Sequence, residues 1–163
     1  MLKLIVSILA LATSVGAIAD LRETDPLAVC SVLADIGLKG RKWVDYGDGT
    51  SGCASDYKEI GKASIGLANN LAFYGMGKGR TADEVKLVLN YNQPKQAPTA
   101  TKELQRAAER LATKMLGTSL SPATENAITT GKPHVEKTGS GEIELTRDEW
   151  VNGNGYEVHV IYR

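Results

Sequence analysis

The sequence predicts an α+β fold, a single-layer antiparallel sheet of about five strands packed against helices on one face, in the order α-β-β-β-α-α-β-β. Residues 64–74 and 85–91 alternate apolar and polar side chains, as strands with one buried face do. Residues 104–115 carry apolar side chains at three- and four-residue spacing, which indicates an amphipathic helix. Strands and helices do not alternate along the chain, so the order of the elements does not indicate a parallel sheet.

The first expected helix spans residues 26–36. Asp25 suits the N-cap, Pro26 suits the first helical turn, and Gly37 suits the end of a helix. Apolar residues recur on one side of this helix, so that side should pack inward.

The segment after this helix contains the first expected strand, residues 41–46. Residues 47–52 are rich in Gly, Asp and Ser and therefore favour a loop. Residues 55–58 fit either a short strand or a loop.

The two strands with clear alternation should form an antiparallel pair, because the glycine-rich residues 75–79 between them favour a flexible turn. Asn69 interrupts the apolar parity, which indicates a bulge or a boundary between strands. The long helix should cover the apolar face of this pair. The expected core residues are Ile65, Leu67, Leu71, Phe73, Val85, Leu87 and Leu89 on the strands and Leu104, Leu111 and Met115 on the helix.

The last part of the chain should contain a short helix and a hairpin. Ser121 and Pro122 favour the start of that helix, and Gly131 favours its end. Two alternating segments, residues 142–147 and 155–162, flank an Asn-Gly-Asn-Gly turn and should pair with each other.

The amino-terminal residues 1–19 resemble a signal peptide. Lys3 supplies a positive charge, an apolar stretch follows, and the small-x-small triplet that ends at Ala19 suits signal peptidase. Cleavage between Ala19 and Asp20 would leave residues 20–163 as one α+β domain in the periplasm or outside the cell. The apolar stretch is shorter than the roughly 20 residues of a membrane-spanning helix, so no span is expected after cleavage.

Charge and motif content exclude several classes of function. The mature chain would carry 18 Lys and Arg residues against 19 Asp and Glu residues, a net charge of about −1 that gives no basis for binding nucleic acid or an anionic membrane. No metal-binding or phosphate-binding motif occurs, so no metal ligand and no cofactor are predicted.

The two cysteines, Cys30 and Cys53, should form a disulfide, since their number is even and the expected compartment is oxidising. The bond would connect the first helix to the segment after the glycine-rich loop. A zinc site is disfavoured because it needs four ligands and both histidines are distant in sequence.

The leading functional hypothesis is a small non-enzymatic binding or accessory protein for a protein, peptide or small apolar ligand. Trp43, Tyr46 and Trp150 lie at the edges of turns, where large aromatic side chains are enriched at binding surfaces. Packing in the core remains the alternative for each of the three residues.

Two alternative functions stay open. An inhibitor or immunity protein against a secreted enzyme would use the loop at residues 47–52. A small hydrolase would use Ser55 or His159, since residues 55–58 fit S-x-x-K and residues 137–139 fit K-T-G, two motifs of serine β-lactamases. That hydrolase reading lacks the intervening S-D-N motif and the larger domain of those enzymes, so no catalytic residue is predicted.

Overall fold

The computed structural model describes residues 21–63 and 65–163. The expected signal peptide, residues 1–19, and its cleavage site lie outside the described residues. In the described part of the chain no helix is long and apolar enough to cross a membrane.

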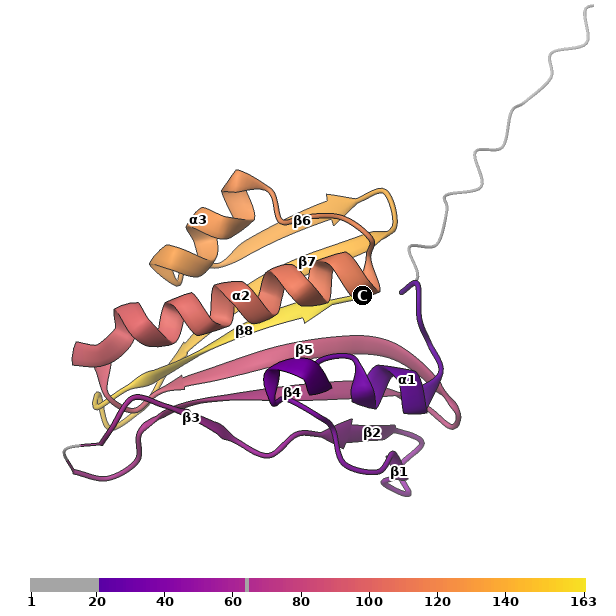
Figure 1. Cartoon of the computed structure of the whole chain (residues 1–163), viewed down its shortest axis with the longest axis horizontal. Coiled ribbons are helices and arrows are strands. Elements are labelled where there is room, and N and C mark those ends of the chain that lie inside the picture. The colour runs from indigo at the N-terminus through magenta and orange to yellow at the C-terminus, as the bar shows by residue number, and fades with distance from the viewer. Residues whose placement is uncertain (1–20, 64) are drawn as a thin grey trace, which may run out of the picture.

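The fold is α+β, with an antiparallel sheet and helices on one of its faces, as the sequence predicts (Figure 1). The described residues form eight strands, more than the predicted five. The order across the sheet is β1-β2-β4-β5-β8-β7-β6, and the short strand β3 also pairs with β4. The strands are β1 (Val44–Asp45), β2 (Ser51–Ala54), β3 (Lys58–Ile60), β4 (Asn69–Lys78), β5 (Thr81–Tyr91), β6 (His134–Thr138), β7 (Gly141–Glu149) and β8 (Tyr156–Tyr162). The helices are α1 (Pro26–Ser31), α2 (Ala97–Met115) and α3 (Pro122–Thr130), with 3-10 turns η1 (Ala34–Ile36) and η2 (Pro94–Gln96).

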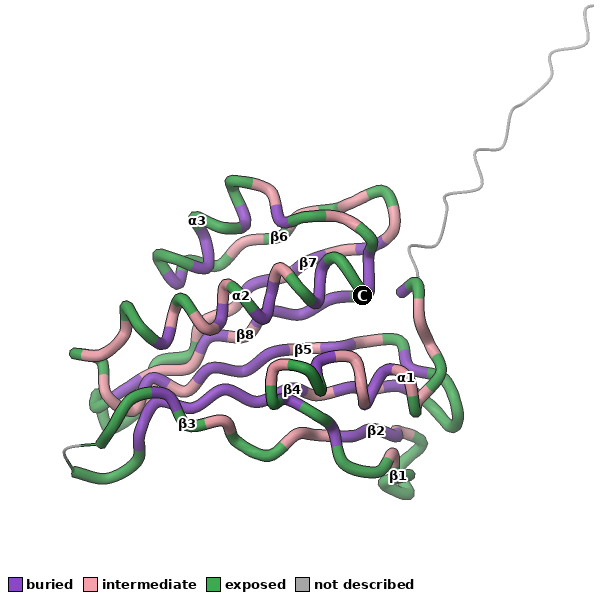
Figure 2. The backbone as a smooth tube through the Cα atoms, in the orientation of Figure 1, coloured by how far each residue is buried: buried purple, intermediate pink, exposed green. Residues whose placement is uncertain are grey.

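The core lies between the central strands and the helices (Figure 2). Helix α2 packs on β3, β4, β5 and β8, α1 packs on β2, β4 and β5, and α3 packs on β6 and α2. The predicted core residues from Leu71 to Met115 are all buried. They are Leu71, Phe73, Val85, Leu87, Leu89, Leu104, Leu111 and Met115.

The prediction is wrong for Ile65 and Leu67, which are 87% and 67% exposed. They precede β4 because Gly66 has a φ of 76°, which ends the extended conformation there. The side-chain amide of Gln93 donates to both of their carbonyls and holds this loop. The break in parity at Asn69 therefore marks the start of the strand.

The glycine-rich segment predicted as a turn is the end of strand β4. A Cβ at Gly75 would lie 2.9 Å from the Val29 side chain, and one at Gly77 would lie 2.0 Å from the Thr81 carbonyl oxygen. These glycines are therefore needed for close packing and for the bulge between Met76 and Gly77, and the turn itself follows at Gly79 and Arg80.

The first helix is shorter than predicted. Asp25 caps it as expected, since its Oδ1 accepts from the backbone N–H groups of Leu27 and Ala28 at 3.0 Å each. The helix ends because other donors occupy its last carbonyls. Gly40 N donates to Cys30 O at 2.7 Å, so this carbonyl is not available to continue the helical ladder. The expected strand at residues 41–46 is likewise reduced to the two residues of β1.

Candidate functional site

A groove of about 620 Å³ lies between α1, the segment at residues 39–43 and the β4–β5 turn. Pro26 and Leu27 belong to the α1 wall. The opposite wall includes Trp43, and Arg80 lies at the end formed by the turn. The volume is within the range of small-ligand and peptide sites, roughly 300–1,000 Å³.

Cys30 lines the groove and forms the predicted disulfide. The Cys30 and Cys53 sulfurs are bonded and their Cα atoms are 6.1 Å apart, within the usual range of roughly 4.4–6.8 Å. The bond connects α1 to β2 and so holds the α1 wall against the sheet. Gly40 crosses directly above it, because a Cβ there would lie 3.0 Å from the Cys53 sulfur.

Two large apolar side chains, Leu27 and Trp43, line the groove. Trp43 is half-buried, and its indole Nε1 donates to the Gly79 carbonyl at 2.8 Å, which fixes the ring between its own segment and the β4–β5 turn. Leu27 is 78% exposed, although it is a large aliphatic residue on the first turn of α1. An exposed leucine beside a fixed tryptophan offers apolar surface to a ligand.

Cationic side chains line the same groove. Lys39, Lys42 and Arg80 form no ion pair with any described residue, whereas Arg41 pairs with Asp56. The one acidic residue in the lining is Asp25, whose Oδ1 caps α1. The groove is therefore electropositive although the whole chain has no net charge.

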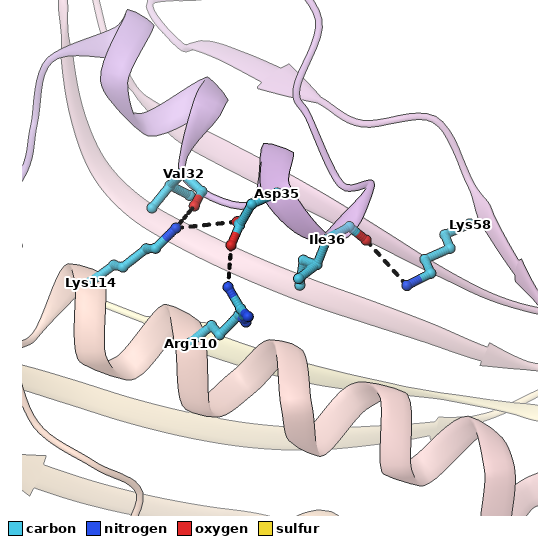
Figure 3. Close-up of polar contacts among 6 residues, drawn as sticks. All are labelled: Val32, Asp35, Ile36, Lys58, Arg110 and Lys114. Atoms are coloured by element: carbon cyan, nitrogen blue, oxygen red, sulfur yellow. Dashed lines mark hydrogen bonds and ion pairs between the residues drawn. The ribbon is translucent and has the colours of Figure 1, made fainter.

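Contacts with α2 and β3 hold the α1–η1 segment in place (Figure 3). Lys114 Nζ donates to the Val32 carbonyl at 2.6 Å and to Asp35 at 3.3 Å, and Arg110 pairs with the same carboxylate. Desolvation opposes ionisation of Asp35, but the hydrogen bond from Lys114 and the two positive charges outweigh it and lower the pKa of the carboxyl group. Lys58 Nζ donates to the Ile36 carbonyl at 3.1 Å. These bonds hold the residues that follow α1 against α2 and β3, and so help to position the α1 wall of the groove.

The structure does not bring the three predicted aromatic residues together. Trp43 lines the groove, and Tyr46 is exposed at the β1–β2 hairpin. Trp150 lines a second hollow of about 370 Å³ with Asn70 and Asn90, at the other end of β4 and β5. The Trp43 ring lies beside Gly75 and the Trp150 hollow beside Asn70, five residues away along β4, which separates them by roughly 17 Å along the strand.

The two residues of the hydrolase hypothesis are also apart. Ser55 Oγ donates to the Asp56 carbonyl at 2.8 Å and accepts from Phe73 N at 3.0 Å, so both of these hydrogen bonds are made with the backbone. Ser55 follows β2, and β4 and β5 lie between it and His159 on β8. Three strand spacings are roughly 14 Å, too far for a hydrogen bond between these two side chains.

His159 belongs to a charged group on the sheet face that the helices leave uncovered. His159 points to the same side of β8 as Glu157, and its Nε2 is 3.3 Å from the Glu157 carboxylate and 4.0 Å from that of Asp148. Asp148, Glu157 and His159 each offer one atom that could bind a metal ion, and these atoms lie within 4.8 Å of one another. The same distances suit an ion pair of a protonated His159 with the two carboxylates.

Sequence reasoning found two groove residues, Trp43 and the disulfide-bonded Cys30, and missed their cationic neighbours. Residues 39–42, Lys-Gly-Arg-Lys, form a local run of positive charge, which the near-zero net charge of the whole chain does not reveal. Arg80 gave no signal, because only the hairpin brings it to the same place.

Comparison of the chain with protein-family models, with curated proteins and with solved structures found no match in any of the three.

Proposed function

We propose that the chain is exported, loses residues 1–19, and acts as a non-enzymatic binding protein whose ligand site is the groove between α1 and residues 39–43. The observation that carries this proposal is the groove itself, with exposed Leu27, fixed Trp43 and three cations that pair with no acidic residue in the described ranges. Such a mixture of apolar lining and a few charged groups is typical of ligand sites.

Two further observations support the proposal. The disulfide is compatible with an oxidising compartment, where the expected signal peptide would send the chain. Ser55 and His159 lie on separate strands, and the Ser55 hydroxyl group is bonded to the backbone, which favours binding over hydrolysis.

Capture with matched variants tests the proposal. The bait is the chain from Asp20 to Arg163, mixed with extract of the native cell envelope. Leu27→Glu removes the apolar contact, and we expect the captured ligand to be lost, because burying a new carboxylate against the ligand costs several kcal/mol. Leu27 is exposed, so the fold should tolerate the change.

Val135→Glu is the control, because Val135 is also an exposed aliphatic residue but lies on the edge strand β6, away from the groove. This variant should capture the same ligand as the wild type. Equal capture by Leu27→Glu and the wild type would show that the ligand binds elsewhere, and the proposed site would then be wrong.

A further inference from the structure

The charge of the groove restricts what binds there. Lys39, Lys42 and Arg80 come from two separate segments and meet around one hollow without acidic partners among the described residues. Three uncompensated cations at one place repel each other and attract anions. A ligand with a single carboxylate would leave most of this charge unmatched, so the ligand should carry several negative charges.

The lining also favours an apolar group beside those charges. The Trp43 ring reaches from residues 39–43 to the β4–β5 turn, the two segments that carry the cations. Leu27, which has no cover from the described chain, lines the same groove. A large aliphatic or aromatic group placed here would be removed from water together with Leu27. The ligand is therefore amphipathic as well as anionic.

The lining distinguishes a peptide from a lipid. Leu27 and the cationic residues of the groove are exposed, so a long acyl chain placed among them would remain partly in water. Asp25, the acidic residue of the lining, gives a second reason to expect a peptide. Asp25 uses Oδ1 to cap α1 and is itself one of the lining residues. A peptide offers backbone N–H groups that can donate to this carboxylate, whereas a phosphate or a fatty-acid carboxylate offers no donor.

We propose that the groove binds an extended acidic segment of a partner protein, with carboxylates on both sides of one aromatic or large aliphatic residue. The carboxylates pair with Lys39, Lys42 and Arg80, and the central side chain packs against Leu27 and Trp43. This inference rests on the proposed function, since it names the class of ligand for the same groove.

Titration with labelled peptides tests the inference. The probe is a pool of five-residue peptides with Asp or Glu at four positions around a central Phe, Trp or Leu, and the readout is fluorescence anisotropy with the chain from Asp20 to Arg163. We expect binding that weakens as salt increases. Replacement of the central residue by Ser, or of the acids by Lys, should abolish binding.

Charge reversals locate the peptide. Lys42→Glu and Arg80→Glu should each weaken binding by about three- to tenfold, because each change turns an attraction into a repulsion. Lys95→Glu, an equal charge change at an exposed position of η2 outside the groove, should change affinity by less than about twofold. Thermal unfolding of all three variants verifies that they fold.

The outcomes separate this inference from the proposed function. If the acidic pool does not bind at millimolar concentration while Leu27→Glu still loses the captured ligand, the groove is the ligand site and the acidic-peptide inference is wrong. Binding of phosphatidylglycerol vesicles that Arg80→Glu abolishes would likewise overturn it, in favour of a lipid. Peptide binding that the charge reversals leave unchanged would place the peptide outside the groove and contradict the inference.

Discussion

Leu111→Ala should lower the free energy of unfolding by about 2–5 kcal/mol, because it removes a fully buried side chain and leaves a cavity between α2 and the sheet. Leu111 belongs to the same buried cluster as Phe73 and Leu87, which lie on adjacent strands under α2. The loss should be large because this helix packs on four strands, β3, β4, β5 and β8, at once.

Urea denaturation followed by circular dichroism measures this loss. Leu27→Ala is the matched control, since it removes the same atoms from an exposed position and should change stability by no more than about 0.5 kcal/mol. If the urea midpoint of Leu111→Ala equalled that of the wild type, α2 would not pack on the sheet as described.

The double substitution of Cys30→Ser with Cys53→Ser should cost about 3 kcal/mol of stability. The disulfide closes a loop with a sequence separation of 23 residues, and opening it restores conformational freedom to the unfolded chain. The sheet should persist, because its strand ladders do not depend on the bond. The α1 wall should loosen most, although Lys114 and Arg110 still hold η1 to α2.

The reductant dithiothreitol provides the control for this prediction. It should lower the urea midpoint of the wild type to that of the double variant and leave the double variant unchanged. A wild-type midpoint that does not respond to the reductant, together with two thiols that react in the unfolded and unreduced protein, would refute the disulfide.

The elements that the sequence predicts well are those whose signal is local. The amphipathic pattern that includes Leu104 and Leu111 lies within α2, the caps Ser121 and Gly131 bound α3, and the Asn-Gly-rich turn joins β7 to β8. Each depends on residues within a few positions of one another, and for this reason their type could be predicted without knowledge of the fold.

The missed strands depend on partners distant in sequence. In β2, Gly52 pairs with Met76 of β4. A Cβ at residue 52 would lie 2.6 Å from the Gly75 carbonyl oxygen, so the close approach of β4 explains why glycine occurs in this strand. The edge strand β6 has only Val135 as a large apolar residue, so it gives no clear alternation. Glycine and polar residues favour loops locally, and pairing across the sheet overrides that preference.

The groove could not be predicted for a related reason. Its lining comes from α1, the residues before β1 and the β4–β5 turn, which the disulfide and the sheet bring together. Of the three aromatic residues that the sequence selected, Trp43 lines the groove, whereas Tyr46 and Trp150 lie elsewhere. Aromatic residues near turns identify candidates, but they do not show which candidates share a surface.

Photocrosslinking in living cells tests most directly whether the groove is the ligand site. A benzoylphenylalanine residue is introduced in place of Leu27 in one strain and in place of Val135 in another, and the exported chain is irradiated and recovered. We predict one discrete adduct from position 27 that is absent from position 135, because only Leu27 lies in the groove. Equal adducts from both positions, or none from position 27, would contradict the assignment of the groove as the ligand site.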